Sequence, residues 1–376
     1  MRKKHKTMVA GHLCLDITPA FSGPGDRKLF DIIGPGKQVL TGPVDIATGG
    51  AVANTGLAMK ILGEDVVLVG KIGKDEFGAL IKGILDKYDC GQTLIEDHHV
   101  TSSYSLVVAL PNIDRFFFHH PGANDHFCLA EIEDSLLQDI SHCHFGYPTL
   151  MAEIYRDQGE GLKQFFKKLQ KRGITTSLDT SMVDFFSEGG KADWEAFLSK
   201  VLPFVDFFLP SAEEFCWMID KVRYQDWIKR AAGGDMMEVI TEDDVSPLAD
   251  KILQLGAKVA LVKCGVLGLV AKTANQEKMA GLLSKYNLKE DWIKQNEFEP
   301  SYHVDHIVSG TGAGDTAIAA FLTGVLRGES LSSCLKLAAA TGALCLSAPD
   351  ALGGIVPYSE VQNKIQAGWK KNKPVS

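Results

Sequence analysis

The sequence predicts an α/β fold built around a mostly parallel β-sheet. From residue 142 onward, short runs rich in β-branched and aromatic residues alternate with longer segments of helical periodicity. This alternation is typical of βαβ units, in which right-handed helical crossovers join parallel strands. Ligands of such sheets bind beyond the carboxyl ends of the strands, so we expect the functional residues in the loops that follow the strands.

The spacing of the apolar residues predicts each element in turn. Predicted strands cover residues 7–13, 66–69, 101–110, 115–119, 142–147, 175–179, 207–209 and 259–262. Predicted helices cover residues 52–62, 77–88, 161–171, 193–201, 212–219, 248–255, 313–327 and 331–347. The segments 14–48 and 98–125 do not follow the alternation and contain turn signals such as Pro111-Asn112. We expect them to form a small sheet-like lid on a single domain that spans residues 1–376.

Composition and charge argue against several classes of function. The formal net charge is −8, so the chain has no general electrostatic reason to bind nucleic acid or an anionic membrane. No apolar run approaches the roughly 20 residues that a membrane-spanning helix needs. The eight cysteines include no CxxC pair, and the histidines beside Cys143 lack the spacing of a zinc site. We therefore expect a cytoplasmic protein with reduced thiols.

A glycine-rich loop runs into an apolar helix at residues 309–315, with the sequence Ser-Gly-Thr-Gly-Ala-Gly-Asp. Glycines let consecutive backbone N–H groups converge on one point, and the helix dipole adds partial positive charge there. The result is an anion hole suited to a phosphoryl group in transfer. Asp315 falls in the first turn, where its carboxylate can take a proton from an attacking hydroxyl. Alternatively, Asp315 serves only the helix dipole. The dinucleotide fingerprint and the P-loop pattern are both absent.

Five blocks in this order carry a resemblance to a known family. They lie at residues 49–54, 70–78, 210–214, 262–268 and 310–315. Together they resemble the ribokinase-like carbohydrate kinases of the PfkB family, over roughly residues 7–357. The resemblance implies a three-layer fold, with a central mostly parallel sheet, helices on both faces and a β lid that pairs in a homodimer. It also implies a sugar-like small-molecule substrate, ATP as phosphoryl donor and Mg²⁺.

The resemblance assigns roles to individual residues. Asp315 matches the catalytic base, and Gly312, Ala313 and Gly314 match the backbone anion hole. The acceptor contacts are Asp16, at the end of the first strand, Gly49, Gly50, Asn54 and the lid residue Arg115. The nucleotide contacts are Lys263, Gly265, Ser211 and Thr311, and Glu214 organises magnesium through water.

Some residues depart from the family pattern. Ser309 replaces an acid that belongs to a monovalent-cation site in some members, which leaves potassium activation open. Ser211 replaces the asparagine of the NxxE motif. The stretches 220–248 and 274–303 are longer than a compact member requires and lie toward the nucleotide side. Arg115 suits an acidic or phosphorylated sugar, but a solvent-facing arginine fits equally. A nucleoside kinase on the same scaffold and a weakly active sugar-binding regulatory protein stay as alternatives.

Overall fold

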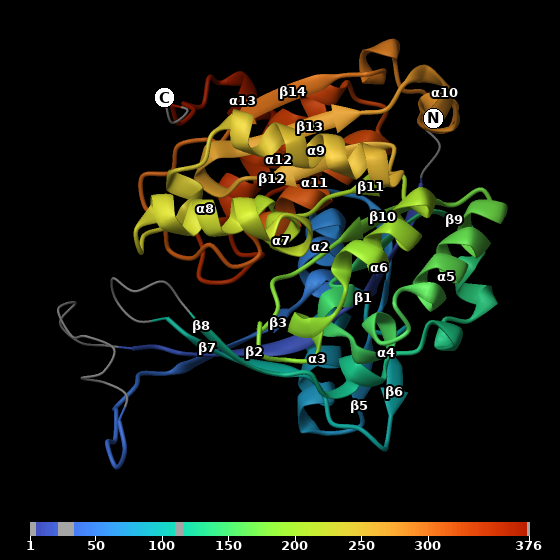
Figure 1. Cartoon of the computed structure of the whole chain (residues 1–376). Helices are drawn as coiled ribbons and strands as arrows, with labels where there is room; N and C mark the ends of the chain where they lie inside the picture. Colours follow the sequence, from blue (N-terminus) through green and yellow to red (C-terminus); the bar gives the residue numbers. More distant parts are fainter. Residues whose placement is uncertain (1–4, 22–33, 110–115, 374–376) are drawn as a thin grey trace.

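The computed structural model describes residues 5–21, 34–109 and 116–373, and its centre is an eight-stranded sheet (Figure 1). The strands lie in the order β14-β13-β12-β11-β10-β9-β1-β4. All pairs from β4 to β12 are parallel, whereas β13 and β14 are antiparallel to their neighbours. The strands are β1 (Lys6–Gly11), β4 (Asp65–Val69), β9 (Ile140–Gly146), β10 (Thr175–Asp179), β11 (Phe207–Phe208), β12 (Val259–Lys263), β13 (Gly268–Thr273) and β14 (Asn296–Pro300).

Helices cover both faces of this sheet, because its central strands are apolar on both sides. One face carries α2 (Ala51–Ile61), α3 (Glu76–Asp86), α10 (Gln276–Tyr286), α11 (Ala313–Leu326), α12 (Leu331–Cys345) and α13 (Tyr358–Gln366). The other carries α4 (Ala152–Tyr155), α5 (Glu160–Lys171), α6 (Trp194–Val201), α7 (Ala212–Ile219), α8 (Lys221–Ala231) and α9 (Glu242–Leu255). In β1, Val9 packs into the first core while Met8 and Ala10 pack into the second. The three-layer prediction is therefore confirmed.

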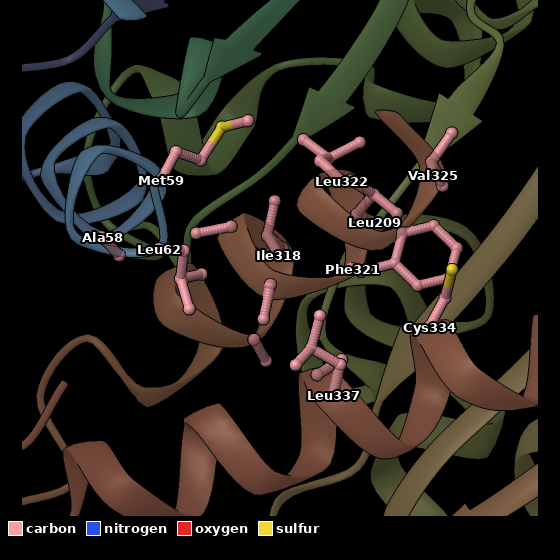
Figure 2. Close-up of a cluster of buried hydrophobic side chains, with 14 of the residues drawn as sticks. Ala58, Met59, Leu62, Leu209, Ile318, Phe321, Leu322, Val325, Cys334 and Leu337 are labelled. Atoms are coloured by element: carbon pink, nitrogen blue, oxygen red, sulfur yellow. The ribbon is translucent and has the colours of Figure 1, made fainter. Parts of the chain in front are cut away.

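Helix α11 is the best-buried element of the first layer. Every residue from Asp315 to Leu326 is buried, between α2 and α12. Figure 2 shows Ile318, Phe321 and Leu322 of α11 pointing into an apolar cluster shared with neighbouring helices. Burying side chains of this size stabilises the fold by roughly 1.5–3 kcal/mol each. This packing fixes the position of the start of α11.

A separate four-stranded sheet extends away from the main body, in the order β3-β2-β7-β8 (Figure 1). Its strands are β2 (Cys14–Pro19), β3 (Val44–Gly49), β7 (Tyr104–Val108) and β8 (Phe116–His120). Strands β2 and β7 are parallel, and each also pairs with an antiparallel neighbour. These strands come from the segments in which a lid was predicted. The turn expected at Pro111-Asn112 lies outside the described residues. A third sheet pairs β5 (Lys71–Gly73) with β6 (Ile95–Asp97).

Two predictions about elements were wrong, and some elements were not predicted. The first strand ends at Gly11, and the chain then crosses into the lid, so Asp16 lies on β2 and not at the end of the first strand. Helix α9 begins at Glu242 and not at 248, because Asp244 accepts a hydrogen bond from the Thr241 N–H at 2.8 Å and so caps the helix before Pro247. Strands β13 and β14 were not predicted, although they complete the main sheet: β13 forms a hairpin with β12, and β14 pairs with β13 after the intervening α10.

The two long stretches form regular structure. Residues 220–248 contain α8 and the start of α9, and residues 274–303 contain α10 and β14. Within the described part of the chain, no helix is both long and apolar enough to span a membrane.

Candidate active site

The glycine-rich loop makes a tight turn directly before α11. Gly312 is the N-cap residue, with φ +76° and ψ 0°, a left-handed conformation that favours glycine. A Cβ atom at this position would also lie 2.3 Å from the Cβ of Ala351. The N–H groups of a first helical turn have no acceptor within the helix, and the helix dipole makes this end partly positive. The turn therefore has the geometry of an anion site.

Asp315 lies in that first turn and is 3% exposed. Its Oδ2 accepts a hydrogen bond from Asn54 Nδ2 on α2 at 2.9 Å. Its Oδ1 accepts one from the Tyr147 hydroxyl, just after β9, at 2.7 Å. Burial raises the pKa of Asp315, and the charge of Lys263 and these two hydrogen bonds oppose that rise. The carboxylate is thus held in one orientation, with a pKa above that of an ordinary aspartate.

Tyr147 was not among the residues singled out from the sequence. Its backbone is left-handed, with φ +61° and ψ 46°, a strained conformation for a residue other than glycine. Its N–H donates to the carbonyl of Asp179 at 3.3 Å, which fastens the turn to the neighbouring strand. Its position directly after a buried parallel strand was the available signal.

A buried charge cluster lies beside this turn, at the carboxyl ends of adjacent strands. Asp179 ends β10, Lys263 ends β12, and Glu214 follows β11 in the first turn of α7. Lys263 Nζ lies 2.9 Å from Asp179 Oδ1, and the two side chains are 11% and 0% exposed. Glu214 Oε2 accepts hydrogen bonds from Thr180 Oγ1 and from the Ser211 N–H, both at 3.1 Å. Asp179 was also missed in the sequence, although it is the last residue of a predicted strand.

The charged groups of this cluster interact electrostatically with Asp315. Burial raises the pKa values of Asp179, Glu214 and Asp315, and Lys263 opposes all three rises. Burial also acts to lower the pKa of Lys263, but the attraction of the three carboxylates outweighs it and raises that pKa. Lys263 therefore keeps its charge.

The other predicted nucleotide contacts have structural roles as well. Ser211 caps α7, since its Oγ accepts a hydrogen bond from the Glu214 N–H at 3.2 Å. Gly265 opens a short 3-10 turn after β12, with φ +52°. Ser309 Oγ donates to Thr311 Oγ1 and accepts from the Thr311 N–H, both at 3.2 Å, so the serine that replaces an acid stiffens the loop.

A cavity of about 300 Å³ lies between the lid and the loop before α11. Predicted site residues Asp16, Asn54 and Thr311 line it, together with Asp45 and Asp350. No lysine or arginine lines it among the described residues. Arg115, the predicted lid contact, lies outside the described residues.

Gly49 and Gly50 follow the cavity-lining residue Thr48, at a place where the backbone packs closely against other residues. A Cβ atom at Gly49 would lie 2.3–2.5 Å from the carboxyl atoms of Asp16. One at Gly50 would lie 2.5 Å from His12 Nδ1, and Gly50 has φ +85°. Close packing therefore requires both glycines, and neither of these predicted acceptor contacts lines the cavity.

Comparisons with known proteins identify the family of the chain. The family model described as the pfkB family carbohydrate kinase matches residues 26–355. An uncharacterized sugar kinase of Archaeoglobus fulgidus is 22% identical over 308 residues, which cover 80% of this chain and 98% of that protein. Probable fructokinase-4 of Arabidopsis thaliana is 25% identical over 367 residues, covering 95% of each chain.

Solved structures support the fold. Arabidopsis thaliana ribokinase complexed with ribose and ATP has a TM-score of 0.69 at 19% identity, over 96% of this chain and 98% of that one. A putative ribokinase II from E. coli in complex with ATP and Mg²⁺ also has a TM-score of 0.69, at 18% identity, over 96% and 99%. The ribokinase-like fold is thus confirmed. With the family match over most of its length, the chain belongs to the pfkB family of carbohydrate kinases, phosphotransferases with an alcohol group as acceptor.

Proposed function

We propose that the protein transfers the γ-phosphoryl group of ATP to a hydroxyl of an uncharged sugar or sugar-like molecule, with Asp315 as the base. The observation that carries this proposal is the buried carboxylate of Asp315 in the first turn of α11. Asn54, which donates a hydrogen bond to it, also lines the cavity, so the base adjoins a place where an acceptor can bind.

The proposed chemistry follows from this arrangement. Phosphoryl transfer depends mainly on positioning and on neutralising the charge of the phosphoryl oxygens. The backbone of Gly312, Ala313 and Gly314 would bind those oxygens at the positive end of α11. Asp315 would take the proton of the acceptor hydroxyl, and a pKa above that of an ordinary aspartate makes it a stronger proton acceptor.

The cavity favours a neutral acceptor. Asp16, Asp45 and Asp350 line it, and no described lining residue is cationic. Carboxylates accept hydrogen bonds from sugar hydroxyls, but they repel the carboxylate or phosphate of an acidic sugar. Relatives are named as fructokinases and ribokinases, and the Arabidopsis ribokinase structure holds ribose. We therefore propose neutral pentoses and hexoses as the first acceptors to test.

Magnesium fits the donor set of the charge cluster. Asp179, Glu214 and Asp315 face one buried lysine, so the cluster carries excess negative charge when all three acids are ionised. The described residues hold no group of three or more acidic, histidine or cysteine ligands. Mg²⁺ is usually held by one or two carboxylates together with substrate phosphates and water, so such a group is not needed. Glu214 would hold the ion, which supplies charge neutralisation when bound.

The nucleotide would lie on the side of the charge cluster, near Gly265 and Thr311, as the resemblance implies. A homodimer through the lid is part of the proposal. The lid exposes apolar side chains on both flanking strands, Val44 and Ile46 on β3 and Phe117 and Phe118 on β8. Such a surface is typical of a protein–protein contact.

The test is ADP release from Mg-ATP over neutral sugars, acidic and phosphorylated sugars, and nucleosides, with and without potassium. We expect turnover with a neutral sugar and a loss of about 100-fold or more in Asp315→Asn. Acceptors should still raise the melting temperature of that variant. Asp206→Asn is the matched control, since Asp206 is 2% exposed and precedes β11 at the opposite end of the sheet.

Each alternative has its own outcome in this assay. Unchanged turnover in Asp315→Asn would remove Asp315 from the role of base. Turnover with nucleosides alone would identify a nucleoside kinase. Thermal stabilisation by sugars without turnover of any acceptor would indicate a regulatory sugar-binding protein.

A further inference from the structure

Lys263 does not line the acceptor cavity and acts on Asp315 through its charge, yet it is one of the most deeply placed charges of the site. Its side chain is 11% exposed and its ammonium pairs with Asp179, which is fully buried. Asp179 Oδ2 is buried too and has no hydrogen-bond partner among the described residues. A buried ion pair that is incompletely hydrogen-bonded contributes little to stability, because desolvation costs as much as the attraction returns. Stability alone is therefore a weak reason for this pair.

The position of the ammonium suggests another reason. A Cβ atom built on Gly314 would lie 3.4 Å from Lys263 Nζ and 3.6 Å from its Cδ and Cε. Gly314 belongs to the turn that forms the proposed anion hole. The end of the lysine therefore lies against the first turn of α11, on the side where the charge cluster faces Asp315.

Charge also distinguishes Lys263. Its positive charge interacts with the carboxylates of Asp179, Glu214 and Asp315 together. Without Lys263, the charged side chains of this cluster would all be negative. A lysine ammonium is a compact point charge that binds phosphate oxygens well, and a buried one acts in a medium of low dielectric constant.

We infer that Lys263 is a catalytic residue whose ammonium binds the phosphoryl group during its transfer. This inference rests on the proposed function. In the step, Asp315 takes the proton of the acceptor hydroxyl, and the acceptor oxygen forms a bond to the γ-phosphorus. The bond from that phosphorus to the β–γ bridging oxygen breaks, and its electron pair leaves on ADP. Lys263 keeps its protons throughout and offsets the charge on the non-bridging oxygens.

Lys263→Met tests the inference. We expect kcat to fall by about 100- to 1000-fold, the loss typical when one hydrogen-bond donor that stabilises charge in the transition state is removed. The KM for the acceptor should change by less than about threefold, because Lys263 does not line the acceptor cavity. Lys263→Arg keeps the charge and should retain more turnover than the methionine variant. Lys272→Met is the matched control: Lys272 is also 11% exposed and pairs with Asp250 at 2.8 Å, but it lies on β13. Its turnover should match that of the unmodified protein.

A double variant separates catalysis from structure. Removing Lys263 alone leaves Asp179 as an unpaired buried charge, which by itself can unfold the protein. Asp179→Asn combined with Lys263→Met removes both charges, so we expect thermal stability to recover while kcat stays low. Recovery of kcat together with stability would overturn the inference and make the pair structural, as would a Lys263→Met variant with normal kcat. If the unmodified protein turns over no acceptor, the proposed function itself fails, which is a different result.

Discussion

The hydrogen bond from Tyr147 to Asp315 leads to a prediction about pH. Tyr147→Phe removes the hydroxyl that donates to Asp315 Oδ1 at 2.7 Å and leaves the ring in place. That hydrogen bond stabilises the ionised carboxylate and opposes the rise that burial imposes on the pKa of Asp315. Without it the pKa of Asp315 rises further. Because the proposed base must be ionised to act, the fall of kcat/KM on the acid side should begin at a higher pH than in the unmodified protein.

The size of this effect can be worked out from the contact. A hydrogen bond to a charged group contributes about 1.5–3 kcal/mol. Since about 1.4 kcal/mol corresponds to a tenfold change in an equilibrium constant, the acid limb of kcat/KM should move up by about one to two pH units. At high pH, where Asp315 is ionised in both proteins, turnover should converge. The prediction is therefore an upward shift in pH that is confined to the acid side of the kcat/KM profile.

The assay is the pH dependence of kcat/KM for the best acceptor, measured over the acid side. Tyr224→Phe is the matched control, because Tyr224 is also buried and its hydroxyl donates to Glu213 at 3.4 Å, on α7. Its profile should overlie that of the unmodified protein. An acid limb that stays in place in Tyr147→Phe, or that moves to lower pH, would refute the view that this hydrogen bond holds Asp315 ionised.

Three further variants test other parts of the site. Gly312→Ala should lose turnover and at least about 1–2 kcal/mol of stability, because φ at Gly312 is +76° and a Cβ atom there would meet Ala351. Gly368→Ala is the control: Gly368 has φ +82° but no atom within 4 Å of an added Cβ, so thermal melting should show only the cost of the left-handed backbone. Glu214→Gln should raise the magnesium concentration needed for half-maximal turnover by about tenfold, and an unchanged requirement in a magnesium titration would contradict a role in holding the ion. Ile46→Lys should shift a lid-mediated dimer to monomer in sedimentation velocity. Leu80→Lys should not, although Leu80 on α3 is about equally exposed. An unmodified protein that sediments as a monomer would contradict dimer formation.

Much of the main sheet could be predicted because its strands are short, apolar and separated by amphipathic helices. The glycine-rich loop could be predicted as well, since both its flexibility and the apolar helix after it are local properties. No individual strand was predicted for β2, β3, β13 or β14. Strand β2 pairs with the distant β7, and β14 pairs with β13 across the intervening α10. Such pairing depends on the context of the sheet more than on the residues themselves. The place of Asp16 was wrong for this reason, because the chain leaves the main sheet at Gly11 for a lid that local patterns describe poorly.

The charge cluster and Tyr147 could not be predicted to lie together, for a different reason. Tyr147, Asp179, Glu214 and Lys263 each follow or end a different strand, and each has an ordinary role when taken alone: a turn residue, a strand end, a helix-dipole acid and a strand-end lysine. Only the parallel order β9-β10-β11-β12 brings them to one edge of the sheet. Once they are together, burial raises the pKa values of the acids, and ionising them then works against folding. A chain selected for stability alone gains more from apolar side chains at these positions. The cost of keeping two acids and one lysine buried at the carboxyl edge, beside the buried Asp315, is therefore itself an argument that this edge is where the chemistry takes place.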